Sequence, residues 1–278
     1  MSSGRFKARL ADAATYLILS VACVWALFPL YMVITTSFKV QSEAFSLPPK
    51  LFSFATTFEH YARVFTEGRF LSYYLNSAIV GIASVAVGLL VGAPAAYTLA
   101  RFPFRGRRAI SWLLLSPRAM PPIVLLLPFF VMWSELGLMD SKIGLTLVYL
   151  QLNLALGVWM LREFFSDIPI EIEEAALVDG CSRTHAFLRV VLPLAAPGLA
   201  ATAILLLIFS WNEFLFAFAL TSQHARTAPV TVFSFVQVEE VLWGQLHAAG
   251  TLIVLPVVLF ALLIQRHLVR GLTAGALR

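Results

Sequence analysis

The sequence predicts an all-α polytopic membrane protein with about six transmembrane helices. Hydrophobic residues make up 60% of the 278 residues, and the mean hydropathy is +0.85. A soluble core of this size cannot bury 23 Phe and 6 Trp, so lipid must surround much of the chain. The apolar residues also fall in runs of about 20, the length that crosses a bilayer. We therefore expect a single transmembrane domain over residues 1–278.

The candidate spans follow one another along the whole chain. They lie near residues 14–36, 72–100, 110–133, 143–162, 197–220 and 248–267. The first follows Arg5, Lys7 and Arg9, as a secretory signal would, but it is too long for a signal core and offers no small-residue cleavage site. We therefore expect a retained first span and both termini in the cytoplasm.

The distribution of positive charge favours this orientation. The segments assigned to the inner side carry 13 Lys and Arg residues and the outer segments carry 6, while Arg118 lies within the third span. Lys and Arg are enriched in cytoplasmic loops. Residues 163–196, between the fourth and fifth spans, are therefore expected in the cytoplasm. The net charge of +5 follows from these flanking charges and requires no nucleic-acid partner.

The second and third spans contain residues that alter helix packing. Gly88 and Gly92 form a small-xxx-small pair in the second span, which favours close contact between helices. Proline removes backbone donors, and carbonyls freed at membrane depth need a neighbouring helix or water. We therefore expect a broken third helix beside a polar pathway. Its prolines are Pro117, Pro121, Pro122 and Pro128.

Two long loops are expected on the outer side. In residues 37–71, Phe58, Tyr61 and Phe65 recur at helical spacing, which predicts a helix at the membrane interface. Residues 221–247 form the second long loop.

A polar island separates the fourth and fifth spans. Carboxylates crowd residues 171–179, although only 13% of the chain is charged. Gly180 favours the left-handed turn that ends a first short helix, Ser182 is a suitable N-cap for a second, and Pro193 prevents its clean continuation. The small side chains of Ala175 and Ala176 let another backbone approach closely. The island is therefore a candidate docking surface.

The spacing within the island matches a known motif. Glu174, Ala175 and Ala176 are followed after three residues by Gly180 and after nine more by Val190, one residue, Leu192 and Pro193. This pattern resembles the EAA loop of permease subunits of ATP-binding-cassette (ABC) importers, with Val190 where the family often has isoleucine. The chain is similar to the carbohydrate-uptake branch, and in particular to the second permease subunit of the maltose transporter. The further matching segments are Asn76-Ser77, Ala95-Ala96-Tyr97, Ala100-Arg101-Phe102, Pro197-Gly198-Leu199, Trp211-Asn212-Glu213 and Gly271-Leu272-Thr273-Ala274-Gly275-Ala276.

The resemblance implies a transport subunit rather than an enzyme. Its expected partners are a homologous permease subunit, two ATPase subunits and an extracytoplasmic solute-binding protein, assembled at the bacterial cytoplasmic membrane. The residues implied in coupling to the ATPase are Glu174, Ala175, Ala176, Asp179, Gly180 and Pro193. Those implied in contact with the binding protein are Val238, Glu239, Glu240 and Val241.

The expected energy source lies on another chain. No Gly-x-x-x-x-Gly-Lys phosphate loop occurs in the sequence, so ATP and Mg²⁺ are expected on the partner ATPase and no cofactor on this chain. We also expect no metal site, because Cys23 and Cys181 lie at different depths and neither has a metal-ligand companion at the usual spacing.

Polar residues within the spans are candidates for the substrate pathway. Glu213 lies in a strongly apolar stretch, where an ionised carboxylate needs a partner or a wet interior. Two interpretations stay open: Glu213 lines the translocation cavity, or it makes a structural hydrogen bond to a neighbouring span. Arg118 is a candidate counter-ion, but it also suits a boundary position with its head group in water. The full candidate set is Arg118, Gln151, Asn153, Trp211, Asn212 and Glu213, of which Gln151 and Asn153 also suit structural roles.

Two other classes of protein fit the sequence less well than an ABC permease does. A stand-alone secondary transporter or channel would carry coupling carboxylates in several spans and an inverted repeat, and a membrane enzyme would need a catalytic cluster. Only Glu213 is deeply embedded, and the two halves show no self-similarity. The sequence therefore favours an ABC importer permease, and its resemblance to the carbohydrate-uptake branch implies a sugar, sugar alcohol or sugar derivative as cargo.

Overall fold

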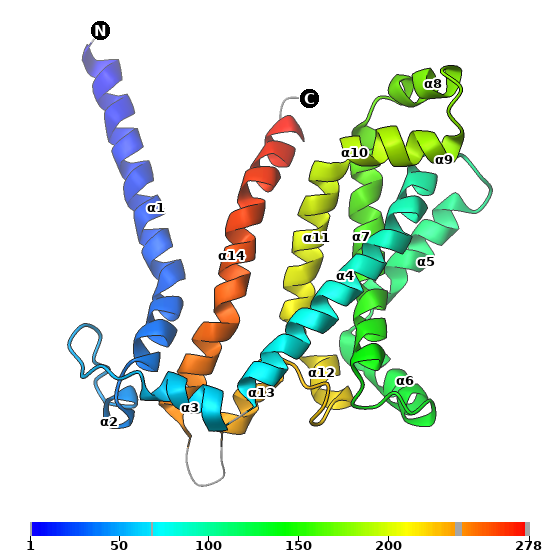
Figure 1. The fold of residues 1–278 in the computed structure, drawn as a ribbon. Coiled ribbons are helices and arrows are strands. Elements are labelled where there is room, and N and C mark those ends of the chain that lie inside the picture. The colour runs from blue at the N-terminus through cyan, green and yellow to red at the C-terminus, as the bar shows by residue number, and fades with distance from the viewer. Residues whose placement is uncertain (1, 68, 237–240, 276–278) are drawn as a thin grey trace. The chain divides into compact units, whose positions relative to one another are not determined.

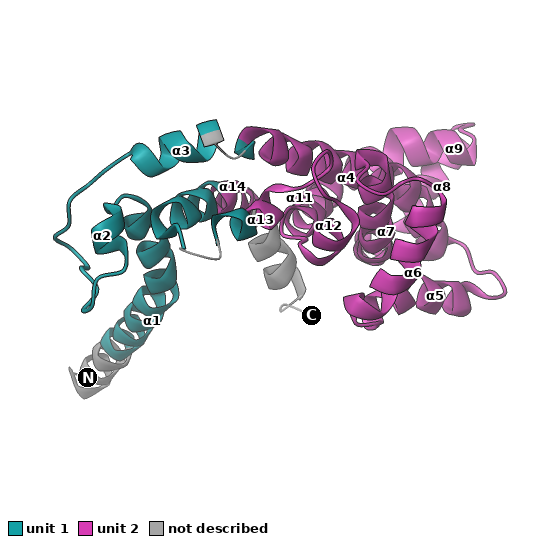
Figure 2. Ribbon diagram, turned by 90° about the horizontal axis from the view of Figure 1, so that it is seen from below, with its two compact units in different colours: residues 1–70, 232–252 teal, residues 71–231, 253–278 magenta. Residues whose placement is uncertain are grey.

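The computed structural model describes residues 2–67, 69–236 and 241–275, and every regular element in these ranges is a helix (Figure 1). The all-α class expected from the sequence is therefore confirmed. The chain divides into two compact units, residues 1–70 with 232–252 and residues 71–231 with 253–278 (Figure 2).

The first unit is built around a long apolar helix. Its elements are α1 (Ser2–Ser37), α2 (Gln41–Ala44), α3 (Glu59–Glu67), η2 (Val232–Phe235) and the start of α14 (Trp243–Gly275). Apolar side chains of α1 such as Trp25 are exposed within this chain, as expected where lipid or another subunit covers a helix.

The helix predicted within residues 37–71 is present as α3, and its place at the membrane interface stays a prediction. The Tyr61 hydroxyl lies 2.7 Å from Ser37 Oγ, and the Phe38 ring packs 5.4 Å from Phe58 and 5.2 Å from Tyr61. The aromatic spacing that predicted this helix therefore also fixes it against the end of α1.

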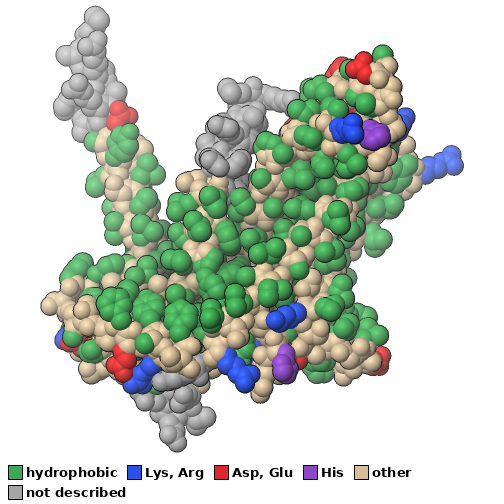
Figure 3. Space-filling model, in the orientation of Figure 1, with side chains coloured by type: hydrophobic (Ala, Val, Ile, Leu, Met, Phe, Trp, Pro, Cys, Tyr) green, Lys and Arg blue, Asp and Glu red, His purple; other side chains and the backbone are tan. Residues whose placement is uncertain are grey.

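The second unit contains the remaining spans and the polar island. Between its two ends, apolar side chains cover most of the visible surface, and charged side chains gather around α8 and α9 (Figure 3). Its elements are α4 (Phe70–Arg101), α5 (Arg107–Ala119), α6 (Pro122–Glu135), α7 (Lys142–Asp167), α8 (Ile170–Val178), α9 (Arg183–Ala186), η1 (Phe187–Val191), α10 (Leu192–Leu194), α11 (Ala196–Trp211), α12 (Leu215–Leu220) and α13 (Ala228–Thr231).

Helices α4 and α7 pack closely through glycines. A Cβ at Gly88 would lie 3.6 Å from Leu150, and one at Gly92 would lie 3.5 Å from Leu154 and from Val158. These are ordinary van der Waals distances. The two glycines therefore face α7, as their spacing predicted, with room for a slightly larger side chain.

Two of the predicted spans are not continuous helices. The span expected at 110–133 is the bent pair α5 and α6, which meet at 93° around Met120 and Pro121, because the proline run withholds the amide donors that a straight helix needs. The span expected at 197–220 ends as α11 at Trp211 and resumes as α12 at Leu215. In the described residues, four helices are long and apolar enough to cross a membrane. The number of spans rises to as many as six if the pair α5 and α6, and the pair formed by residues 183–194 and α11, each count as one.

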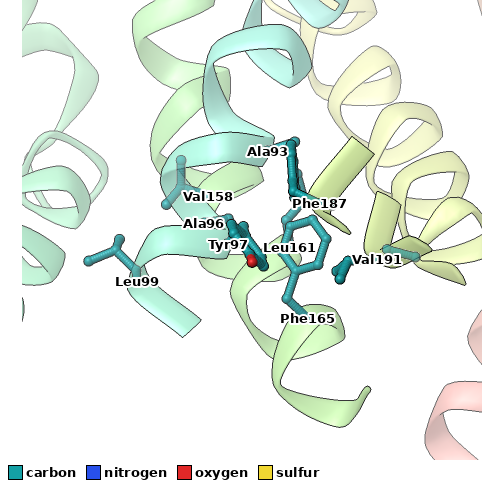
Figure 4. Close-up of a cluster of buried hydrophobic side chains, with 10 residues drawn as sticks. Ala93, Ala96, Tyr97, Leu99, Val158, Leu161, Phe165, Phe187 and Val191 are labelled. Carbon is teal, nitrogen blue, oxygen red and sulfur yellow. The ribbon is translucent and has the colours of Figure 1, made fainter. Parts of the chain in front are cut away.

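A buried apolar cluster joins the ends of α4 and α7 to η1 (Figure 4). The Tyr97 ring from α4 lies 4.6 Å from Phe187 of η1 and 5.9 Å from Phe165 of α7. Aromatic packing of this kind contributes beyond the area that it buries. The polar island is therefore held against α4 and α7 by a buried apolar cluster.

Candidate functional site

The polar island folds as two short helices that meet at a corner. Helix α8 is capped at Asp179, and Gly180 follows with a φ of +91°, the left-handed conformation that glycine adopts readily. Ser182 is the N-cap of α9, and its hydroxyl accepts from the backbone N–H of His185 at 3.4 Å. The helix end and the second helix start therefore lie where the sequence predicted them.

One face of this corner is open to a partner. Glu174, Ala175, Asp179 and Gly180 are exposed, and Val178 is 87% exposed although it is apolar. Ala176, in contrast, is only 9% exposed, and its carbonyl accepts from the N–H of Cys181 at 3.0 Å. The structure therefore exposes most of the predicted coupling residues, including Pro193. Ala176 is the exception, because its side chain is buried against the rest of the protein.

Glu173 is a functional candidate that sequence reasoning did not single out. Its carboxylate accepts from the Tyr97 hydroxyl and lies 3.2 Å from Arg101 Nε, and both charged side chains are 8% exposed. Arg101 also donates to the Ile168 carbonyl at 2.7 Å. Because Tyr97 and Arg101 are one turn apart on α4, they hold α8 from one helix face. One feature of the sequence could have pointed to Glu173. It lies three residues before Ala176, and this spacing places both side chains on one helix face, away from Glu174.

A cavity of about 400 Å³ opens inside the second unit beside the α5–α6 bend. Of the candidate pathway residues, Arg118, Asn153, Asn212 and Glu213 line it. Phe209, Phe214 and Tyr149 supply aromatic wall, so the cavity combines ring faces with a few polar groups. This composition suits a polar organic ligand.

Glu213 occupies the break between α11 and α12. Its carboxylate oxygens accept from the backbone N–H groups of Phe216 at 2.9 Å and Ala217 at 3.2 Å. A carboxylate at a helix N-terminus satisfies donors that have no partner within the helix. Glu213 therefore lines the cavity and also caps α12, which combines parts of both interpretations drawn from the sequence.

Asn153 joins three spans. Its amide donates to Ser210 Oγ at 2.8 Å and to Ser84 Oγ at 3.1 Å, and all three residues are buried. Such side-chain hydrogen bonds help to hold neighbouring transmembrane helices together. The network links α4, α7 and α11 at the cavity wall, to which Asn153 and Ser210 both belong.

The other candidate pathway residues have different surroundings. The Arg118 guanidinium lies 4.6 Å from the centre of the Phe209 ring, and no ion pair within 4.0 Å joins it to Glu213. Trp211 is buried, donates to the Ile253 carbonyl at 3.0 Å and does not line the cavity. Gln151 also lies outside the cavity lining, and its amide oxygen is buried with no hydrogen-bond partner among the described residues.

Asp140 fastens two loops of the second unit. Its carboxylate accepts from the backbone N–H groups of residues 222–225 and from the Ser222 hydroxyl, at 2.8–3.1 Å. Burial raises the pKa of the Asp140 carboxyl, but the N–H donors of Ala225, His224 and their neighbours outweigh burial and hold this pKa below its usual range. No sequence signal reveals this contact, because the partners are separated by more than 80 residues.

The predicted contact with a binding protein is only partly visible. Val238, Glu239 and Glu240 lie outside the described residues. Val241 forms an isolated bridge with Val236, and its carbonyl accepts from the Gln41 amide at 3.3 Å.

Comparison with known proteins identifies relatives across nearly the whole chain. Residues 88–274 match the family described as "Binding-protein-dependent transport system inner membrane component". A trehalose transport system permease of Mycobacterium tuberculosis is 37% identical, over 91% of this chain and 93% of that protein. A trehalose/maltose transport system permease of Thermococcus litoralis is 35% identical, over 94% of each chain. A crystal structure of a bacterial ABC transporter that imports the acidic polysaccharide alginate superposes with a TM-score of 0.77 at 22% identity, covering 93% of this chain and 96% of that one, which supports the fold.

Proposed function

Because the chain belongs to the family of binding-protein-dependent transport system inner membrane components, we propose that it is the permease subunit for import of a sugar, sugar alcohol or sugar derivative. As an ABC permease it is a multi-pass inner membrane protein, and ATP hydrolysis lies on a separate ATPase. The sugar class is supported by the named cargoes of similar permeases, which include trehalose and trehalose/maltose. A homologous permease and a solute-binding protein complete the proposed importer, with both termini of this chain in the cytoplasm.

The observation that carries the proposed mechanism is the two-sided character of α8. Its outer face presents Glu174, Ala175 and Val178 to a partner, and its inner face sends Glu173 to Tyr97 and Arg101. A force applied to the outer face therefore reaches α4 through a buried ion pair and a hydrogen bond rather than through a flexible loop. In this proposal, closure of two ATPase subunits on ATP moves α8 and η1 as one lever.

The same movement reaches the cavity through α11. Residues 183–194 meet α11 at 72°, and α11 carries Ser210 and Phe209 to the cavity wall. Alternating access requires an element with two arrangements whose balance both the ATPase and the substrate shift. The broken segments at Met120 and at 212–214 supply positions where the wall can rearrange without breaking a continuous helix.

The test of this function is an exposed substitution on α8. Ala175→Asp places a carboxylate on the docking face without disturbing the core, whereas Ala176 is buried and any side chain at Gly180 is strained by the positive φ. We expect Ala175→Asp to insert normally, to lose ATPase subunits on purification in mild detergent, and to reduce uptake of radiolabelled trehalose or maltose more than tenfold. This assumes that one of these sugars is a cargo, which binding assays on the partner solute-binding protein establish first.

The matched control is Ala62→Asp, the same change at an exposed helical alanine on α3. It should leave ATPase association unchanged. Normal uptake and normal ATPase recovery with Ala175→Asp would contradict the docking role of α8. Uptake by this chain reconstituted without an ATPase would contradict the proposed function itself.

A further inference from the structure

A second cavity, separate from the one beside the α5–α6 bend, lies between the start of α5 and the end of α7. Its volume is about 770 Å³, and its lining includes Arg107, Arg108 and Arg162 together with Trp112 and Trp159. None of the described residues that line it is acidic. Three arginines therefore line one space whose described lining contains no acidic residue.

The arginines of this cavity are largely uncompensated. Arg162 lies 2.9 Å from the exposed carboxylate of its neighbour Glu163. No ion pair within 4.0 Å joins Arg107 or Arg108 to a carboxylate in the described part of the chain. Like charges that converge without counter-ions repel one another, and a bound anion relieves this repulsion. Guanidinium groups match phosphate oxygens in geometry as well as charge.

Apolar surface continues directly from the charged lining. A narrow crevice of about 20 Å³ shares Ser111, Leu115, Trp159 and Arg162 with the cavity, and the rest of its lining is Leu99, Leu114, Ala155 and Val158. Trp112 is 70% exposed and Trp159 is 47% exposed, as is typical of tryptophans at the boundary between lipid and water. A free phosphate ion would use the arginines and leave this apolar surface uncovered.

We propose that the α5–α7 cavity binds an anionic phospholipid, with the phosphate on Arg107, Arg108 and Arg162 and an acyl chain against the exposed apolar surface of Trp112 and Trp159. Basic pockets between transmembrane helices on the cytoplasmic side recognise such head groups. The cavity lies at the end of the second unit that carries α8, because Arg101, six residues before Arg107, donates to Ile168 at 2.7 Å. Under the orientation proposed above, the lipid belongs to the cytoplasmic leaflet.

Native mass spectrometry of the purified complete transporter tests the site. The complex is delipidated in mild detergent, incubated with phosphatidylglycerol and compared with Arg108→Gln, Arg162→Gln and the double variant. Each arginine near a membrane surface contributes about fivefold to anionic lipid binding, so the double variant should bind about 25-fold more weakly. Binding of phosphatidylcholine should change less than about twofold in the same variants.

The matched control is Arg105→Gln, which removes the same charge two residues before α5 begins, at an exposed position that does not line the cavity. It should retain phosphatidylglycerol as the wild type does. The proposal is overturned if Arg105→Gln weakens binding as much as Arg108→Gln, because surface charge alone then explains the attraction. It is also overturned if the double variant, with an unchanged melting temperature, retains phosphatidylglycerol as well as the wild type.

Discussion

At the scale of single residues, neighbouring glutamates on α8 have opposite environments. Glu174 is exposed, whereas Glu173 is buried against Tyr97 and Arg101. The motif in the sequence drew attention to Glu174 alone. Burial of Glu173 depends on which face of a nine-residue helix meets α4, and the local pattern does not determine that contact.

The Glu173 contact should contribute to stability. Removing one partner of a buried ion pair leaves the other charge uncompensated, so Glu173→Ala should lower the melting temperature of the purified complex by about 5 °C or more. The control is Glu174→Ala, which should leave the melting temperature within about 1 °C because that carboxylate is solvated. Equal melting temperatures for the two variants would show that the buried pair does not hold α8 on α4.

Glu213 gives a second prediction at this scale, because its two roles respond differently to substitution. Glu213→Ala removes both acceptors of the α12 cap and should destabilise the protein by about 1 kcal/mol. Glu213→Gln keeps one amide oxygen as acceptor, so its stability and its apparent KM for transport should stay close to wild type.

Thermal unfolding and uptake assays on the same preparations measure these effects. Asn212→Ala is the control for stability, because among the described residues the Asn212 side-chain amide donates to the Ile208 carbonyl of the adjoining helix α11 and not to another helix. A tenfold loss of uptake in Glu213→Gln at an unchanged melting temperature would assign the charge to the pathway instead of the cap.

At the scale of elements, two glycine contacts differ in how much space they leave. A Cβ at Gly198 on α11 would lie 2.5 Å from Cγ of Phe164 on α7, whereas one at Gly92 meets its neighbours at 3.5 Å. Gly198→Ala should therefore cost about 1–3 kcal/mol by overpacking, and Gly92→Ala should be tolerated. Melting temperatures of the two purified variants provide the comparison. Similar values for both would mean that the Phe164 ring moves aside without cost.

The tie between Asp140 and residues 222–225 predicts a pH dependence. Because the pKa of Asp140 is lowered in the folded protein, the stability from this carboxylate is fully present above its unfolded pKa of about 3.9 and is lost as the pH falls through the folded value. The melting-temperature difference between wild type and Asp140→Asn should therefore be constant from about pH 8 to pH 5 and shrink below about pH 4.

The control is Glu135→Gln, at an exposed carboxylate five residues earlier in the chain. Its melting temperature at pH 7 should lie within about 1 °C of wild type. A difference between wild type and Asp140→Asn that vanished already at pH 6 would contradict a lowered pKa.

At the scale of the whole molecule, the sequence predicted the helical class and the corner between two short helices at Gly180 and Ser182. Apolar runs and the turn residues Gly180 and Ser182 act on the backbone close to them in the sequence. The helices and helix ends that they predict therefore depend little on contacts with distant parts of the chain. Proline placement predicted a broken third span but not its 93° bend. The break at 212–214 was missed, because the apolar residues on both sides of Asn212 and Glu213 together have the length and composition of one span, while the contact that stabilises the break is a single side-chain cap.

Candidate site residues were predicted less completely, for the same reason. One cavity is lined by four of the candidates, Arg118, Asn153, Asn212 and Glu213. Trp211, which directly precedes Asn212, instead packs against Tyr74 and Phe260. Polarity and aromatic character identify candidates for a pathway, but only the rotation of α11 decides which of them reach it. That rotation is fixed by contacts with helices far away in the sequence.

The Asp140 contact also constrains how the chain is assembled. Asp140 is synthesised more than 80 residues before the backbone donors that it binds, with α7 to α12 made in between. Its carboxylate must remain hydrated until all of these segments have been placed and 222–225 has reached the same side of the membrane. The hydrogen bonds between Asp140 and residues 222–225 can therefore form only after α7 to α12 are in place. If any of these helices is inserted wrongly, the Asp140 carboxylate stays exposed to water.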